Sequence, residues 1–248
     1  MDDSLDGKAA LVTGGARRVG AAIARRLHAA GARVLLHYRD SEADAARLES
    51  ELNAARARSA AKVKAELLAP IAPRALIGTA IETFGRLDIL VNNASTFFPV
   101  PVGEIESSHW EELVGANLRA PLFISQQAAP ELAKNEGSIV NIVDIHAERP
   151  LKGYALYSVT KAGLASLTRS LAIELAPRVR VNGVAPGAIA WPEDGQFENA
   201  ERARIVASTP LGRVGSPEDI ARAVHFLACA PYVTGQILAV DGGRSIFI

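Results

Sequence analysis

The sequence has little of several things, and each shortage excludes a class of protein. Its one cysteine, Cys229, cannot form an internal disulfide, which is typical of a chain from a reducing compartment. Its 27 basic residues are balanced by 27 acidic ones, so no excess positive charge indicates nucleic-acid binding. No apolar run approaches the roughly 18 residues of a membrane span. The first residues, MDDSLDGK, lack the basic and apolar segments of a signal peptide. We therefore expect a cytoplasmic protein with no nucleic-acid or membrane partner.

Patterns of metal-ligating residues are also scarce. His37 and His146 each lack a second ligand at a spacing typical of metal sites. His225 and Cys229 are four residues apart, but they lie in the apolar run AVHFLACA, where we expect core packing. The sequence therefore predicts no metal site.

Hydrophobic residues, by contrast, make up 49% of the 248 residues, enough for a sizeable core. Short apolar runs alternate with longer segments that have apolar residues at helical spacing, such as VGAAIARRLHAAG, which ends at Gly31, and PEDIARAVHFLACA, which begins at Pro217. This alternation predicts one α/β domain over residues 1–248, with a parallel sheet covered by helices on both faces. The predicted strands are 8–13, 32–38, 61–66, 87–93, 137–143, 179–185 and 236–240.

The first predicted strand runs into the glycine-containing turn TGGARRVG at 13–20 and then into a helix. Such a turn lets backbone N–H groups and the start of the helix face a pyrophosphate, which predicts a dinucleotide site. The alternative is a tight turn that binds nothing. The residues expected to contact the cofactor here are Gly14, Arg17, Arg18, Val19 and Gly20.

The end of the second predicted strand, HYRD, indicates which dinucleotide fits. Sites that prefer NAD place an acid about 20 residues beyond the glycines, where it holds the ribose hydroxyls. Here that position is Tyr38, with His37 before it and Arg39 after it. Arg39, with help from Arg17, would bind a ribose phosphate through its two-pronged guanidinium. We therefore expect NADPH, although both arginines could be solvated surface charges and Asp40 weakens the case.

The motifs TGGARRVG, LDILVNNAS, Asn117, Tyr157 and Lys161 at a spacing of four, PG at 186–187 and VDGG at 240–243 follow one another in this order. With them the chain resembles the short-chain dehydrogenase/reductase family over nearly its whole length. The resemblance implies a Rossmann-type, doubly wound, seven-stranded parallel sheet and assembly as a homotetramer.

The resemblance also implies roles for individual residues. Tyr157 would donate the proton, Lys161 would lower the pKa of the phenol and hold the nicotinamide ribose, and Asn117 would anchor a chain of waters. A phenol donates poorly near neutral pH unless a cation stabilises its anion, so the Tyr–Lys pair also makes chemical sense. An ordinary amphipathic helix is the alternative. The further residues expected at the cofactor are Glu66, Asn93, Ala94, Ser95, Tyr157, Lys161, Pro186, Gly187 and Ile189.

Several positions depart from the common pattern of the family. Asp144 stands where a serine is usual, thirteen residues before the tyrosine, and Arg18 replaces the middle glycine of the turn. A serine hydroxyl suits a ketone because it donates to the developing oxyanion, whereas a carboxylate would repel that oxyanion. A carboxylate instead favours a substrate with N–H donors or a nitrogen that becomes protonated. Phe97 and Trp191 offer flat faces for an aromatic heterocycle.

These departures resemble the pteridine reductases within the family. They imply NADPH-dependent reduction of pterins, dihydropterins or dihydrofolate, with hydride transfer to a C=N bond and proton delivery by Asp144 and Tyr157. The expected substrate-binding residues are Arg18, Ser95, Phe97, Asp144, Tyr157 and Trp191. Residues 191–210 are expected to form a lid over the substrate.

Other interpretations remain open at this point. Asp144 could only cap the next segment or pair with His146 or Arg149. Phe97 and Phe98 could both be core, and if one faces a ligand we favour Phe97. The protein could reduce a ketone, such as a 3-oxoacyl thioester or a sugar, or it could bind a dinucleotide without catalysis.

Overall fold

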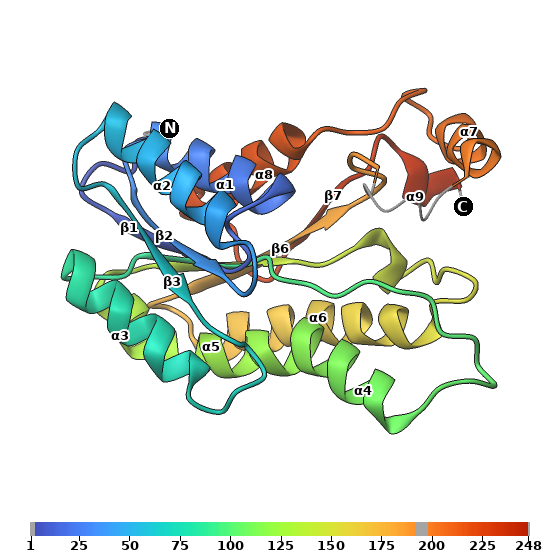
Figure 1. Cartoon of the computed structure of the whole chain (residues 1–248), viewed down its shortest axis with the longest axis horizontal. Helices are drawn as coiled ribbons and strands as arrows, with labels where there is room; N and C mark the ends of the chain where they lie inside the picture. Colours follow the sequence, from blue (N-terminus) through green and yellow to red (C-terminus); the bar gives the residue numbers. More distant parts are fainter. Residues whose placement is uncertain (1–2, 192–197, 248) are drawn as a thin grey trace.

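A computed structural model describes residues 3–191 and 198–247 of the chain. Seven parallel strands form one sheet in the order β3-β2-β1-β4-β5-β6-β7 (Figure 1). Every strand falls on a predicted apolar run, so the predicted fold class is confirmed. The strands are β1 (Ala9–Val12), β2 (Arg33–Tyr38), β3 (Ala60–Lys64), β4 (Ile89–Asn92), β5 (Ser138–Ile142), β6 (Arg180–Pro186) and β7 (Ile237–Val240).

Helices cover both faces of the sheet (Figure 1). One layer contains α1 (Arg18–Ala29), α2 (Glu42–Ala55) and α8 (Pro217–Cys229). The opposite layer contains α3 (Ala72–Phe84), α5 (Ala120–Lys134) and α6 (Ala155–Glu174). Because both faces are covered, the central strands β1, β4 and β5 are buried along their whole length rather than at alternate positions.

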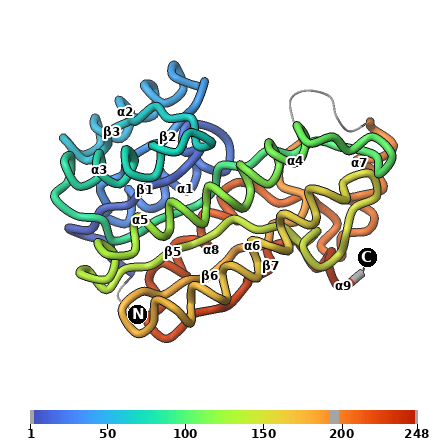
Figure 2. Tube along the Cα trace, turned by 90° about the horizontal axis from the view of Figure 1, so that it is seen from below, coloured from blue at the N-terminus to red at the C-terminus, as the bar shows by residue number. Residues whose placement is uncertain are grey.

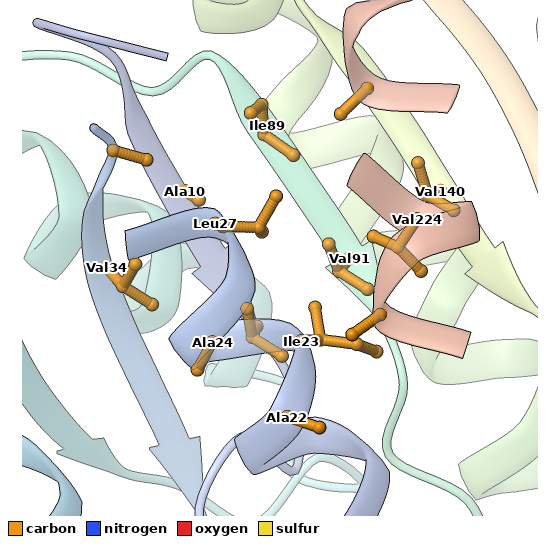
Figure 3. Close-up of a cluster of buried hydrophobic side chains, with 14 of the residues drawn as sticks. Ala10, Ala22, Ile23, Ala24, Leu27, Val34, Ile89, Val91, Val140 and Val224 are labelled. Carbon is orange, nitrogen blue, oxygen red and sulfur yellow. The ribbon is translucent and has the colours of Figure 1, made fainter. Parts of the chain in front are cut away.

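A hydrophobic cluster packs the layer of α1, α2 and α8 against the sheet. Ile23 and Leu27 of α1 and Val224 of α8 are fully or almost fully buried against strand residues such as Val34 and Val91 (Figure 3). The start of α8 is fixed by a capping box in which the Ser216 N–H donates to Asp219 Oδ2 at 2.9 Å and the Asp219 N–H donates to Ser216 Oγ at 3.3 Å. The predicted helix start at Pro217 is therefore confirmed.

Shorter segments gather beyond the carboxyl ends of β4 to β7, where ligands bind in open parallel sheets. α4, α7 and α9 all lie toward the same end of the molecule, on the right in both views (Figures 1 and 2). No described helix is long and apolar enough to cross a membrane. The segments are α4 (Ser107–Val114), η1 (Gly115–Arg119), η2 (Ile145–Ala147), α7 (Asn199–Ala207) and α9 (Arg244–Phe247).

Candidate active site

Two adjoining cavities lie along this edge of the sheet, and Arg18, Val19 and Ser95 line both of them. The first cavity, of about 430 Å³, is lined by the glycine turn and the ends of β2, β3 and β4. The predicted cofactor residues that line it are Gly14, Arg17, Arg18, Val19, Gly20, His37, Tyr38, Arg39, Glu66, Asn93, Ala94 and Ser95.

The second cavity, of about 600 Å³, lies beyond the ends of β5 and β6. All of the predicted substrate-binding residues line it, although they come from five separate segments of the chain. The predicted residues that line it are Arg18, Ser95, Phe97, Asp144, Tyr157, Pro186, Gly187, Ile189 and Trp191.

The glycine turn is packed so closely that two of its glycines cannot be replaced without displacing the backbone. A Cβ on Gly20 would lie 2.0 Å from the carbonyl oxygen of Gly14, and Gly14 itself has φ of +60°. Asn93 braces the turn, because its Nδ2 donates to the carbonyls of Thr13 at 2.9 Å and Gly14 at 3.1 Å. The turn therefore brings the start of α1 against the cavity.

Arg18 takes an unusual place in this turn. Its φ is +49°, a left-handed conformation that costs a residue with a Cβ about 1 kcal/mol. Its Nη2 donates to the carbonyl oxygen of Ala190 at 3.1 Å. Arg18 thus joins the glycine turn to the segment after β6, across the border of the two cavities.

His37 supports the turn rather than offering polar atoms to a ligand. The Gly14 N–H donates to its Nδ1 at 3.0 Å, and its Nε2 lies 3.1 Å from the carbonyl oxygen of Ala65. Burial lowers the pKa of His37, so the ring is neutral with its proton on Nε2. Its side chain lines the first cavity, but both ring nitrogens are already bonded to the backbone.

The two arginines expected at a ribose phosphate both lie at the rim of the first cavity, and each has a carboxylate beside it. Arg39 Nε donates to Asp40 Oδ2 at 2.7 Å, and Arg17 Nε lies 3.6 Å from Asp44 Oδ2. The side chains of Arg17 and Arg39 are 50% and 60% exposed. The carboxylate of Asp40 would compete with a ribose phosphate for Arg39, and this is the physical reason why Asp40 weakens the case for NADPH.

Tyr157, Lys161 and Asp144 come together beside the second cavity, which Tyr157 and Asp144 line. The Tyr157 hydroxyl donates to Asp144 Oδ2 at 2.8 Å. Lys161, one turn along α6, donates from Nζ to the carbonyl oxygen of Ile142 at 3.0 Å and lies 5.7 Å from the centroid of the Tyr157 ring. Lys161 is buried and lines neither cavity, so the ring of Tyr157 is in the better position to meet a ligand.

The pKa of Tyr157 is raised well above 10.0, and the lowering effect expected of Lys161 stays a prediction. Burial is the main cause, followed by the charge of Asp144 and the hydrogen bond to it. The hydroxyl faces a carboxylate, while the ammonium of Lys161 faces the Ile142 carbonyl instead. Burial also lowers the pKa of Lys161 to about 8, against the opposing effect of Asp144. The phenol is therefore held in its protonated form.

Asp144 also has the capping role that the sequence left open. Its Oδ1 accepts the backbone N–H of His146 at 2.8 Å and so caps η2, while Oδ2 accepts from Tyr157. The His146 ring contacts the carbonyl oxygen of Arg149 at 2.7 Å. One carboxylate thus shapes the loop and orients the phenol.

Asn117 lies in the π-helical turn η1 and ties three segments together. Its Oδ1 accepts from Ser95 Oγ and from the Thr96 N–H, both at 2.9 Å. Its Nδ2 donates to the Thr96 carbonyl at 2.9 Å and to Thr160 Oγ1 at 3.3 Å. These four bonds use the whole hydrogen-bonding capacity of the amide. A chain of waters would therefore have to be anchored by the backbone of Asn117.

The adjacent aromatic residues after β4 separate as expected, because Phe97 lines the second cavity and Phe98 lines neither. Phe97 stacks on Tyr154 with centroids 4.6 Å apart and meets Tyr157 edge to face at 4.7 Å. Phe98 packs near His109, at 6.1 Å between centroids. Phe97 therefore fixes the ring of Tyr157 as well as forming part of the wall.

The predicted lid contains both described and undescribed residues. Trp191 lines the second cavity, and the guanidinium of Arg202 lies 5.3 Å from the centroid of its ring. Residues 192–197 lie outside the described part of the chain. Farther on, α7 contributes Glu201, Arg204 and Ile205 to the cavity wall.

Sequence reasoning missed several residues of the second cavity. Arg244 of α9 and the α7 residues Glu201 and Arg204 line it, and all three are charged. Nothing in the motif VDGG indicates that the next residue turns back toward Asp144. Within residues 3–191 and 198–247, no group of three or more His, Cys, Asp or Glu side chains could hold a metal ion.

Comparisons with known proteins agree with this geometry. A family model described as enoyl-(acyl carrier protein) reductase matches residues 14–245. Pteridine reductase 1 of Leishmania tarentolae is 39% identical, with 99% of each chain covered. A protein of Streptomyces violaceoruber assigned as ketoacyl reductase 2 of granaticin polyketide synthase is 38% identical, with 98% of each covered. Both relatives match from end to end, so the comparison spans the cofactor and substrate cavities alike.

A solved structure shows the same fold with a cofactor. The blue fluorescent protein from a metagenomic library, crystallised in complex with NADPH, superposes with a TM-score of 0.89 at 39% identity, covering 97% of this chain and 99% of the other. The sheet order, the glycine turn and the family match lead to one assignment. The chain belongs to the short-chain dehydrogenase/reductase family, and it is an NAD(P)(H)-dependent oxidoreductase.

Proposed function

We propose that this enzyme uses NADPH to reduce the C=N bond of a pterin, a dihydropterin or dihydrofolate. The observation that carries the proposal is the Asp144 carboxylate, 2.8 Å from the Tyr157 hydroxyl, at a cavity wall it shares with Phe97 and Trp191. A carboxylate there repels the oxyanion of a reacting ketone but attracts a ring nitrogen that gains a proton. The similarity to pteridine reductase 1 over the whole chain is consistent with it.

The residues of the first cavity fit a dinucleotide phosphate. Close packing at Gly14 and Gly20 sets the turn at the start of α1 against this cavity, and Arg17 and Arg39 also line it. When bound, the nicotinamide supplies the hydride for the reduction. We assign the ribose phosphate to Arg39, which would exchange Asp40 for it.

The protein's own part in the reaction is the proton. Tyr157 holds its proton because burial and Asp144 raise its pKa, so the phenol enters the reaction protonated. As the proton leaves toward the ring nitrogen, Asp144 keeps the oxygen in line, and the positive charge of Lys161 stabilises the phenolate. Phe97 keeps the phenol ring from turning. Asn117 holds Ser95 in the wall beside this site.

Ketone reduction is the second candidate, favoured by the 38% identical relative assigned as a ketoacyl reductase. NADPH oxidation should be followed with dihydrobiopterin, dihydromonapterin, dihydrofolate, biopterin, an acetoacetyl thioester and a simple sugar ketone. We expect turnover of the dihydro compounds. Turnover of the thioester alone would establish the ketone reductase instead, and tight NADPH binding without any turnover would indicate a non-catalytic protein.

Cofactor choice provides a separate test. We expect Arg39→Ala to lower kcat/KM for NADPH about 10- to 100-fold, because a hydrogen bond to a charged group contributes about 1.5–3 kcal/mol. The same variant should use NADH as the wild type does. Arg25→Ala, which removes a half-exposed arginine of α1 paired with Glu51 of α2, is the matched control. Equal losses with both cofactors would refute the assignment of Arg39.

The pKa of Lys161 predicts how the rate depends on pH. Because the pKa is lowered to about 8, Lys161 carries its charge below pH 8 and loses it as the pH rises through 8. If the ammonium stabilises the phenolate, kcat/KM should be level below this value and fall about tenfold per pH unit above it. Lys161→Arg keeps a charge that does not titrate, so it should lack this fall. A wild-type profile level to pH 10 would exclude the role.

We also propose that the chain acts as a homotetramer of single-domain subunits with α7 covering the substrate. Apolar side chains are exposed on and near the edge strand β7 and on α8: Phe226 is 45% exposed and Leu238 is 39% exposed. Such residues are typical of surfaces buried between subunits. Sedimentation velocity would measure the mass in solution.

A further inference from the structure

The second cavity contains a buried arginine that the proposed chemistry does not use. Arg244 is the first residue of α9 and is 9% exposed. It lines the second cavity, as Asp144 and Tyr157 do. It follows the two glycines of VDGG, which have φ of +67° and +85° and turn the chain back over the cavity.

The position of Arg244 is fixed by hydrogen bonds on both sides of it. Asp241 Oδ1 accepts the N–H of Gly243 at 2.9 Å, and Asp241 Oδ2 accepts the N–H of Ser245 at 2.7 Å. The Leu211 N–H donates to the Gly242 carbonyl at 3.1 Å. Arg244 is therefore presented to the cavity by an ordered turn.

The guanidinium has no protein partner among residues 3–191 and 198–247. Its Nε is shielded from solvent and has no hydrogen bond, and no described carboxylate forms an ion pair with it. Arg180, another arginine with limited exposure, donates to the carbonyls of Leu227 at 2.7 Å and Ala228 at 2.6 Å. A guanidinium stays charged at any ordinary pH, and a buried charge without a partner is costly. Arg244 is thus an exception that a ligand would explain.

The charged groups around Arg244 already have other partners. Burial lowers its pKa, the charge of Asp144 opposes this, and Arg204 adds to it. Asp144 accepts from Tyr157 and His146, and Arg204 lies 3.8 Å from Glu201. With Arg18, three arginines face two carboxylates across the cavity. The cavity is therefore one in which a negative group would be stabilised.

We propose that Arg244 binds an acidic substituent of the substrate, a carboxylate or a phosphate, and so makes the enzyme selective for an anionic heterocycle. The inference rests on the proposed function and adds the substrate class to it. The guanidinium offers two parallel N–H donors, which match both kinds of anion. Asp144 would meet the reacting nitrogen, and Arg244 would meet the acidic group.

The experiment compares neutral and acidic substrates of Arg244→Gln. With dihydrofolate, whose glutamate is a dicarboxylate, or with dihydroneopterin phosphate, we expect kcat/KM to fall about 10- to 100-fold, mostly through KM. With dihydrobiopterin, which is neutral, it should change less than about threefold. The acidic substrate that loses more identifies the anion. Arg244→Lys should restore part of the loss, and Arg178→Gln, an exposed arginine beside Glu136 at 3.5 Å, should change nothing.

A second measurement does not depend on turnover. Binding of folate and of biopterin to the NADP-loaded protein, followed by tryptophan fluorescence, should show a weaker folate Kd in Arg244→Gln and an unchanged biopterin Kd. Equal effects on both, no effect on either, or a loss of NADPH affinity would overturn the proposal. If the wild type reduces no pterin, the proposed function fails, and folate binding that is insensitive to Arg244 would then overturn this inference independently.

Discussion

Replacing Tyr157 by Phe is expected to lower kcat for dihydropterin reduction about 10³-fold, within the range that a positioned proton donor contributes. The change removes one oxygen and leaves the ring, which Phe97 holds edge to face at 4.7 Å. The Kd for NADPH should therefore stay within about threefold of the wild type, since no cofactor contact of the first cavity is altered. Stopped-flow reduction under single-turnover conditions measures the chemical step directly.

Tyr232→Phe is the matched control for this experiment, because Tyr232 is fully exposed and lines neither cavity. It should behave as the wild type. Removing a general acid usually leaves about a hundredth of the rate or less. If Tyr157→Phe kept more than about a tenth of the wild-type rate, the proton would therefore have to come from another group. Asp144 would then be the first candidate, since it is the acidic group beside the phenol.

Asp144→Asn is expected to have the second largest effect, a fall in kcat of about 10²-fold with dihydrobiopterin. Asp144 accepts from the His146 N–H on Oδ1 and from Tyr157 on Oδ2, whereas an asparagine would present an NH₂ group to one of these two donors. The substitution also removes the negative charge that helps to raise the pKa of Tyr157, so the absorbance of tyrosinate should appear at lower pH than in the wild type. The NADPH Kd and the Tm show whether the fold survives.

Asp144→Ser sharpens the comparison, because a serine hydroxyl donates to a ketone oxygen where the carboxylate repels it. We expect this variant to lose pterin reduction and to gain measurable turnover of an acetoacetyl thioester. A near-normal kcat for Asp144→Asn, with no gain of ketone turnover in Asp144→Ser, would mean that residue 144 only shapes the loop after β5.

The fold was predictable because its signals are local. Each strand is a short apolar run, the turn at 13–20 needs glycine for close packing, and Pro217 marks a helix start that the capping box of Ser216 completes. None of these requires knowledge of what the segment contacts.

The site was only partly predictable because its electrostatics arise between distant segments. The spacing of Tyr157 and Lys161 put them on one side of a helix, but only the structure shows the ammonium facing Ile142 and the phenol facing Asp144. Burial of the phenol, followed by the charge of Asp144, raises its pKa, and the sequence indicates neither effect. Arg244 lies 100 residues beyond Asp144 in the sequence, and no periodicity or motif predicts that their charges meet.

Arg18 connects two segments that line the cavities, the glycine turn and the segment after β6. It and Ala190 both have left-handed backbone conformations, with φ of +49° and +43°, and they are joined by a single hydrogen bond although 172 positions separate them. Conformations of this kind cost roughly 1–3 kcal/mol each and persist only where their surroundings impose them. Part of the folding free energy thus holds the walls of the two cavities in a fixed relative position. Arg18→Gly would remove the backbone strain at this residue, and it would also remove the hydrogen bond that joins the two cavity walls.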